Sequence, residues 1–158
     1  MNELEKRVEA MMHLCVAERE EEKEALREEI RSYLRERLVR TGPERELRRL
    51  LLELGAPDHL VGHPYVIRAV LLVVENRLLI NSITFGLYPQ LAAEFDTTPA
   101  RVERAIRHLI EVTWSRGDMD VLDKYFGNTI SASRGKPTNG EFIARMANVV
   151  KGNLHLAA

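Results

Sequence analysis

The sequence is poor in cysteine, and this shortage limits how the chain can be stabilised. Cys15 is the single cysteine among 158 residues, so an intrachain disulfide and a multi-cysteine metal site are both excluded. The lone thiol suits a reducing compartment, and we expect it to be a buried side chain. The alternative is that it forms an intermolecular disulfide. Apolar residues still make up 45% of the chain, which is enough for a core and excludes a wholly disordered protein.

Long apolar runs are also missing. The most apolar stretch, residues 66–80, is interrupted by Arg68, Glu75 and Arg77, and it falls short of the roughly 20 residues that a membrane span requires. The first seven residues mix acids with bases and lack the apolar segment of a signal peptide. We therefore expect a soluble cytoplasmic protein that has no membrane partner.

The chain has almost no net charge, because 23 Lys and Arg stand against 24 Asp and Glu. Nucleic-acid-binding domains are usually basic, so this total by itself argues against such a function. Residues 1–41 hold 9 bases and 11 acids, which leaves 14 bases and 13 acids for the other 117 residues. Neither part has an excess of charge that decides function, so the positions of individual charges matter more than the total.

Residues 1–41 contain neither glycine nor proline and predict helix. Acids and bases recur at the spacing of helix neighbours: Glu3/Arg7, Glu20/Lys23, Glu24/Arg27, Glu28/Arg31 and Glu36/Arg40. An all-charged stretch, residues 18–24, interrupts the apolar stripe, so the segment is either one long helix or two. The stripe needs a partner surface, which is either the rest of the chain or a second copy. A homodimer would use Leu26, Ile30 and Leu34.

Thr41-Gly42-Pro43 predicts a break, with Pro43 in the first turn of a new helix. That helix would end at Gly55. Its apolar face is formed by Leu47, Leu50, Leu51 and Leu54. We therefore divide the chain into a charged helical segment, residues 1–41, and a domain, residues 42–158.

Helical patterns continue along this domain. Residues 65–80 are apolar on nearly all sides and predict the most buried helix; a strand at residues 69–74 is the weaker interpretation because the run is too long. Capping residues, prolines and periodicity predict further helices at residues 82–95, 99–116, 120–126 and 141–150, the last one opened by a capping box at Thr138 and Glu141. Since no strand is convincing, the predicted fold class is all-α.

Residues 89–110 fit a helix-turn-helix, in which two short helices cross closely around a tight turn. Ala92 is the small residue that a close crossing needs, and Asp96-Thr97-Thr98 form a polar turn. The second helix can pack through Val102, Ala105, Ile106 and Leu109. In a helix-turn-helix the second helix enters the major groove of DNA.

The other face of this second helix carries side chains that suit base edges, because Arg can donate to guanine and Glu can accept from cytosine. Arg101, Arg104, His108, Glu111 and Ser115 lie on this face, with Glu103 and Arg107 beside it. Thr97, Thr98 and the helix N-terminus suit phosphates. The alternative interpretation is that Glu103 and Arg107 simply form a surface ion pair.

The same residues carry a resemblance to a known family. Thr97-Thr98, then residues 101–108 and 110–117, closely resemble the C-terminal effector domain of the sporulation master regulator Spo0A. Further matching pieces are Gly55-Ala-Pro57 with His59 and Gly62, Ser82-Ile-Thr84, Leu87-Tyr-Pro89, Lys136-Pro-Thr-Asn139 and Glu141-Phe-Ile-Ala144. The resemblance covers about residues 45–150.

This resemblance implies a six-helix domain that binds TGTCGAA-like boxes, often in tandem, and activates or represses transcription. It implies base contacts by the residues at Arg101, Glu103, Arg104, Arg107 and His108. It also implies phosphate contacts by Ser82, Thr84 and Lys136, although Lys136 fits a solvated loop lysine nearly as well. The last helix, which contains Phe142 and Met146, would contribute to dimer contacts.

The chain departs from the family pattern in two ways. The family joins this domain to a phosphorylatable receiver, and forty residues of charged helix are not such an α/β domain; dimerisation by residues 1–41 could replace the switch. The position after Thr84 is usually lysine in the family and is Phe85 here. This difference removes an expected phosphate contact and bears on affinity more than on sequence choice.

Other chemistry has little support in the sequence. The five histidines have no metal-ligand spacing, and we find no nucleophile beside a base and no phosphate-cradling glycine loop. Trp114 is expected in the core. We therefore expect neither an enzyme nor a cofactor or metal site.

The sequence thus predicts a homodimeric DNA-binding transcription regulator, bacterial and associated with the nucleoid when bound to DNA. The alternative is a protein-interaction module, in which the N-terminal helix or Phe85 binds another transcription regulator.

Overall fold

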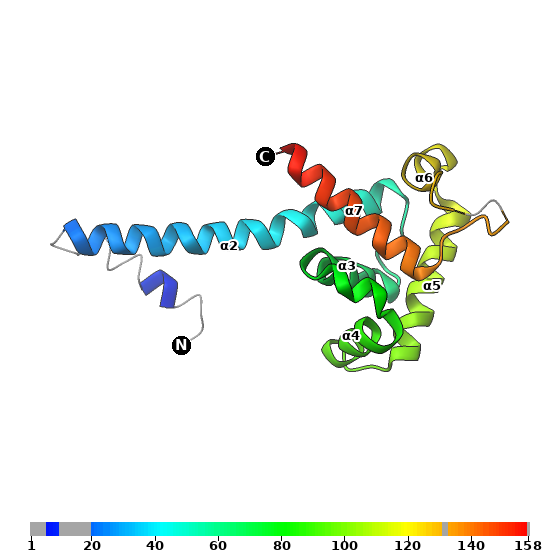
Figure 1. Cartoon of the computed structure of the whole chain (residues 1–158), viewed down its shortest axis with the longest axis horizontal. Helices are drawn as coiled ribbons and strands as arrows, with labels where there is room; N and C mark the ends of the chain where they lie inside the picture. The colour runs from blue at the N-terminus through cyan, green and yellow to red at the C-terminus, as the bar shows by residue number, and fades with distance from the viewer. Residues whose placement is uncertain (1–5, 10–19, 131–132, 158) are drawn as a thin grey trace. The chain divides into compact units, whose positions relative to one another are not determined.

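The computed structural model describes residues 6–9, 20–130 and 133–157, without the side chains of residues 36–41 and 157 (Figure 1). Every regular element in these ranges is a helix, and none of the described residues forms a strand. The predicted all-α fold class is therefore confirmed. The chain divides into two compact units, residues 1–42 and residues 43–158.

The charged segment is helical where it is described. Residues 6–9 are helical, and α2 (Glu20–Glu53) begins in the first unit and ends in the second. Three of the expected ion pairs are present: Lys23–Glu20 at 2.8 Å, Arg27–Glu24 at 3.2 Å and Arg31–Glu28 at 3.4 Å. The guanidinium of Arg7 lies 3.3 Å from the centre of the Tyr33 ring. The pairs Glu3/Arg7 and Glu36/Arg40 involve residues or side chains outside the described set, as does Cys15.

The predicted break at Thr41-Gly42-Pro43 is wrong, because α2 continues through Pro43. A proline removes one backbone donor and crowds the carbonyl four residues earlier, so it weakens or bends a helix without having to end it. Leu47, Leu50 and Leu51, on the turns that follow, are fully buried. This packing stabilises the helical conformation beyond the proline.

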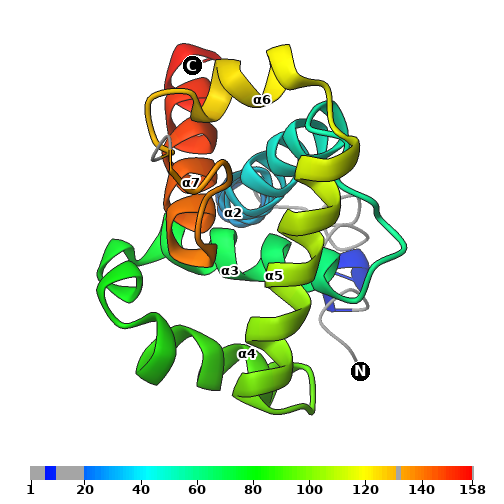
Figure 2. The ribbon, with the colours of Figure 1, turned by 90° about the vertical axis from the view of Figure 1, so that its right-hand side faces the viewer.

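Within its described residues, the second unit contains seven further helical elements. They are α3 (Gly62–Glu75), the 3₁₀ helix η1 (Arg77–Asn81), the π-helical turn η2 (Ile83–Leu87), α4 (Tyr88–Glu94), α5 (Pro99–Arg116), α6 (Met119–Phe126) and α7 (Asn139–Ala157). Figure 2 shows α3 between α7 and α5, and it packs against both. The apolar run is therefore the central helix, as predicted, and not a strand.

Two predicted helix ends differ from the structure. The central helix ends at Glu75 and not near Ile80, because Asn76 is extended (φ −134°, ψ 95°) and its side-chain oxygen accepts from the Leu78 amide at 3.1 Å. This Asn cap starts η1 and competes with a continuing helix. The last helix runs on to Ala157, beyond the predicted end at residue 150.

An aromatic cluster joins α5, α6 and α7. The Trp114 ring meets Phe126 edge-on at 5.0 Å between centroids, and Phe126 stacks on Phe142 at 5.3 Å. Trp114 packs against the core, as the sequence predicts. Phe142 and Met146 are 1% and 0% exposed, so their side chains belong to the core of a single chain and leave no surface for a second copy. This burial argues against the prediction that Phe142 and Met146 contribute to a dimer contact.

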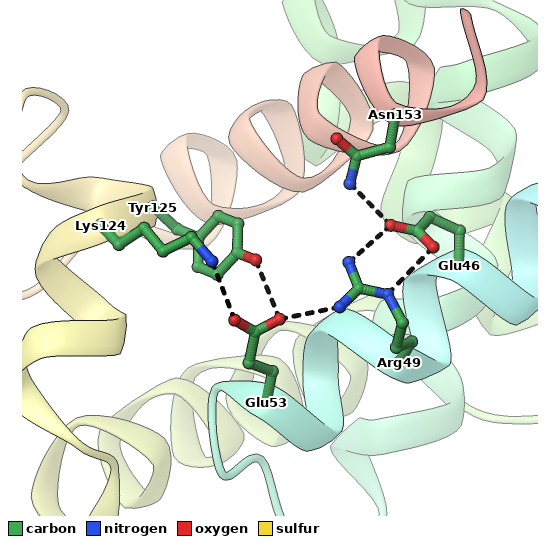
Figure 3. Close-up of polar contacts among 6 residues, drawn as sticks. All are labelled: Glu46, Arg49, Glu53, Lys124, Tyr125 and Asn153. Carbon is green, nitrogen blue, oxygen red and sulfur yellow. Dashed lines mark hydrogen bonds and ion pairs between the residues drawn. The ribbon is translucent and has the colours of Figure 1, made fainter. Parts of the chain in front are cut away.

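A polar network fastens the end of α2 to α6 and α7 (Figure 3). Arg49 bridges Glu46 and Glu53 on its own helix, at 2.8 Å and 3.0 Å. Glu53 also accepts from the Tyr125 hydroxyl at 2.9 Å, and Glu46 from the Asn153 amide at 2.6 Å. The hydrogen bond from Arg49 lowers the pKa of Glu46, and that from Tyr125 lowers the pKa of Glu53. The ionised form of each carboxylate therefore stabilises the folded state.

Gly62 allows α3 and α5 to cross at close range. A Cβ built on Gly62, at the start of α3, would overlap the carbonyl oxygen of Ala105 on α5 and lie 3.1 Å from the Leu109 Cβ. The oxygen belongs to the backbone and cannot turn aside as a flexible side chain could. The distance between α3 and α5 at this crossing therefore depends on the absence of a side chain.

Replacing Gly62 with Ala is expected to lower the free energy of unfolding by about 2–3 kcal/mol, because α3 and α5 must separate and lose packing. Urea denaturation followed by circular dichroism measures the change. Gly152→Ala is the matched control, since nothing lies within 4 Å of its added Cβ. That control should be neutral or raise stability by up to about 1 kcal/mol through helix propensity. Equal loss in both variants would contradict the tight crossing.

Acid should weaken the α2 network. Because the folded-state pKa values of Glu46 and Glu53 lie below their ordinary value of 4.5, their stabilisation is complete above that value and is lost as the pH falls through the lowered values. The double variant Glu46→Gln/Glu53→Gln should therefore be less stable than wild type at neutral pH, and the gap should narrow as the pH falls below 4.5. Urea denaturation of both proteins at each pH measures the gap. A constant gap across this range would contradict the assignment.

Candidate nucleic-acid interface

α4 and α5 form the predicted helix-turn-helix, and the turn between them has a defined hydrogen-bond pattern. The Phe95 amide donates to the Leu91 carbonyl at 3.0 Å, and the Thr97 amide donates to the Ala92 carbonyl at 2.9 Å. Asp96 between them has a φ of +49°. This is the Schellman arrangement with a left-handed residue after the helix, a position that Asp tolerates better than most non-glycine residues. Ala92 is 5% exposed at the crossing, as expected of a small residue there.

Contacts to α3 fix the position of α4. Arg68 binds the Glu94 carboxylate through two nitrogens, at 2.6 Å and 3.1 Å, and lowers the pKa of that carboxyl. The Tyr65 ring meets Phe95 edge-on at 4.8 Å between centroids. Sequence reasoning missed both contacts, because their partners are 26 and 30 residues apart and no local spacing indicates them.

Thr98 caps α5, because its hydroxyl oxygen accepts from the Arg101 amide at 3.3 Å. The packing face of α5 is as predicted: Val102, Ile106 and Leu109 are fully buried. Thr98 is exposed and Thr97 is half-buried. The cap and the buried face together determine which side of α5 points outward.

The outward side divides into two sets of charges. Arg101, Arg104 and His108 are exposed, and the structure gives them no ion pair with any described residue. Arg107, by contrast, binds the Glu103 carboxylate one turn earlier. The surface ion pair considered as an alternative therefore exists in the free protein. In this pair Arg107, one of the predicted base-contacting residues, is bound to a carboxylate, whereas the other basic residues of this face have no ion pair with a described residue.

A groove of about 550 Å³ lies beside α5, between this helix, the η2–α4 segment and residues 134–140. It brings together Thr84, Glu103, Arg107 and Lys136 from the predicted site, whereas Ser82 is exposed but does not line it. Lys136 binds Glu111 on α5 at 2.9 Å and lowers the pKa of that carboxyl. The structure thus places one predicted phosphate contact, Lys136, next to an acid of α5.

Asn139 holds one side of this groove in place, a role that sequence reasoning missed. Its side-chain amide donates to the Tyr88 hydroxyl and to the Glu103 carbonyl, both at 3.0 Å. The predicted capping box is confirmed, since the Thr138 amide donates to the Glu141 carboxylate at 2.9 Å and the Glu141 amide to the Thr138 hydroxyl at 3.2 Å. The start of α7 is therefore attached to both α4 and α5.

Phe85 stands beside this surface. It lies in η2, next to Thr84, and its side chain is 89% exposed. Leu78, in η1, is 74% exposed. An aromatic residue thus stands where the family usually has lysine, and the structure leaves it exposed.

None of the helices within the described residues combines the length and the apolar character that crossing a bilayer demands. In the same part of the chain no three His, Cys, Asp or Glu side chains gather as metal ligands would.

A comparison with protein families supports the interpretation of this surface. Residues 47–150 match the family described as the sporulation initiation factor Spo0A C terminal. The match extends from the buried end of α2 through the helix-turn-helix to Val150 in α7, well over half of the chain. The family is a helical, DNA-binding transcription effector domain without catalytic activity. The chain therefore belongs to the Spo0A C-terminal family of DNA-binding effector domains.

Proposed function

We propose that this protein is a sequence-specific transcription regulator that reads TGTCGAA-like boxes with the N-terminal half of α5. The observation that carries the proposal is the set of exposed basic side chains on that helix: Arg101, Arg104 and His108 have no ion-pair partner among the described residues. The buried opposite face holds α5 in one orientation. In a helix-turn-helix such outward side chains meet base edges in the major groove.

The chemistry of these residues fits guanine-containing boxes. Arg101 and Arg104 lie three residues apart, nearly one turn, so both reach the same side of the helix. Each guanidinium can donate twice to one guanine. The first turn of α5 presents backbone amides, and the hydroxyls of Ser82, Thr84 and Thr97 can donate to phosphates along the edge. Glu103 can accept from cytosine only after it leaves Arg107.

The near-neutral charge of the chain has a consequence for this proposal. Non-specific binding depends on neutralised phosphates, so few unpaired cations should give weak affinity for random DNA. Discrimination then depends on base contacts and on pairing two copies. The protein is expected to bind its box with a shallower salt dependence than strongly basic regulators show.

Replacing Arg104 with Ala should abolish the preference for a TGTCGAA box, with a loss of about 1–3 kcal/mol in specific binding, because a two-bond contact to guanine is removed. Mobility shifts on the box and on a scrambled duplex of equal length measure the preference. Arg116→Ala is the matched control, since it removes the same charge from the last turn of the same helix. It should keep the preference. A folded Arg104→Ala protein that discriminates as well as wild type would sink the assignment of base reading to α5.

We also propose that the first part of α2 pairs two copies of the chain. Leu26 and Ile30 are half-buried, and Leu34 is 50% exposed, on one face of this charged helix. Together with Tyr33 they lie within about one quarter to one third of the helix circumference, at 100° per residue. Phe142 and Met146 no longer belong to this proposal, because they are buried in the core.

The double variant Ile30→Glu/Leu34→Glu should be monomeric, because two charges interrupt the apolar face. Sedimentation equilibrium of the full chain measures the mass. Ala25→Glu/Ser32→Glu is the matched control; it adds the same charge on the opposite side of the helix and should leave a dimer. A wild-type chain that sediments as a monomer at micromolar concentration would refute pairing through α2.

A second function, docking of another transcription regulator, is favoured by the exposure of Phe85 and Leu78. A folded protein that does not bind the box even at low salt would favour it over DNA reading. If Phe85→Ser still binds the box specifically, Phe85 is not required for DNA binding. The DNA-binding measurements then give no support to the docking function.

A further inference from the structure

The cations along the groove beside α5 are each matched by a carboxylate. Arg107 binds Glu103, Lys136 binds Glu111 at 2.9 Å, and Arg134 lies 3.6 Å from Glu141. Arg101 and Arg104, earlier on the same helix, have no such partner among the described residues. The reading surface therefore combines unpaired cations at its base-reading end with neutralised cations along its edge.

The Lys136–Glu111 pair joins two rigid parts of the domain. Glu111 stands on α5, one turn beyond Arg107. Lys136 comes just before the buried Pro137 and the capping box that starts α7. Asn139 bonds this start to α4 and α5. The two charges are thus held opposite one another by the fold, although they are 25 residues apart.

The pair is also accessible. The side chains of Lys136 and Glu111 are 46% and 44% exposed, so water and a DNA phosphate can both reach the ammonium. Exposed pairs of this kind are weak, and a phosphate can replace the carboxylate when DNA is held in place. A carboxylate close to the DNA path also repels the phosphate backbone whenever it has no cation beside it.

Building on the proposed function, we propose that Glu111 is a specificity-determining residue, because its carboxylate competes with DNA phosphates for Lys136. On random DNA no base contact holds α5, so the pair stays closed and Lys136 adds nothing to binding. On the correct box the contacts of Arg101 and Arg104 keep α5 in register, and the backbone phosphate displaces Glu111. Lys136 then contributes only to the specific complex.

Glu111→Gln is expected to raise the affinity for random DNA by about three- to tenfold. The slope of log affinity against log salt concentration should become steeper by about one, because one more cation contacts a phosphate. Specific affinity should rise by less than about twofold, since Lys136 already makes this contact there. The ratio of specific to non-specific affinity should fall. Fluorescence anisotropy of the full chain, on a box duplex and a scrambled duplex over a salt series, measures all three.

Two controls separate this effect from a general change of charge. Glu44→Gln removes the same charge and releases Arg48 from an exposed pair on α2, at 2.7 Å, outside the groove. It should leave non-specific binding nearly unchanged. In a Lys136→Met background, Glu111→Gln should leave the salt slope unchanged and give a smaller gain than in wild type, because the released cation is missing and only the repulsion by the carboxylate is removed. Glu111→Ala should behave like Glu111→Gln.

The inference is overturned if Glu111→Gln binds random DNA no better than wild type, or if the full gain and the steeper salt slope persist in the Lys136→Met background. These results are distinct from failure of the proposed function. A wild-type protein that prefers no box contradicts sequence-specific reading, while the non-specific measurements still test the role of Glu111. A wild-type protein that prefers the box, with an unchanged Glu111→Gln variant, contradicts only the inference.

Discussion

The close crossing of α3 and α5 at Gly62 is the constraint on which the rest of the domain depends. The backbone of α5 occupies the space that a side chain at this position would fill. α3 is the central helix and also packs against α7. Because α5 lies directly on it, the buried face of α5 is fixed, and the charged face must turn outward. A domain with a wider crossing would leave the reading helix less firmly oriented.

Polar contacts then hold the helices around α5 in fixed positions relative to one another. Glu94 ties α4 to α3 through Arg68, and Asn139 ties α7 to α4 and α5. The end of α2 is fastened to α6 and α7 by the network around Arg49 (Figure 3). The contacts between different helices join residues that are distant in sequence. Together they give a small domain a stiff surface, which base recognition needs because a hydrogen bond to a base edge fails when its donor is misplaced.

On this surface, which cations are paired with carboxylates matters more than how many cations there are. The chain has a net charge of −1, and a basic excess does not mark a DNA-binding face. What distinguishes α5 is that its early arginines are unpaired while Arg107 and Lys136 are bound to carboxylates. If α5 reads bases as proposed, this pairing shifts binding energy from phosphates, which carry no sequence information, to bases, which do.

Local patterns in the sequence determined the helices, the capping box and the face of α5, because these depend on neighbours three or four residues apart. The same patterns placed Arg101, Arg104 and His108 outward. The continuous α2 through Pro43, the core burial of Phe142 and Met146, and the pairing of Lys136 with Glu111 could not be read from them. Each of these depends on which distant segment packs alongside, and only the tertiary structure decides that.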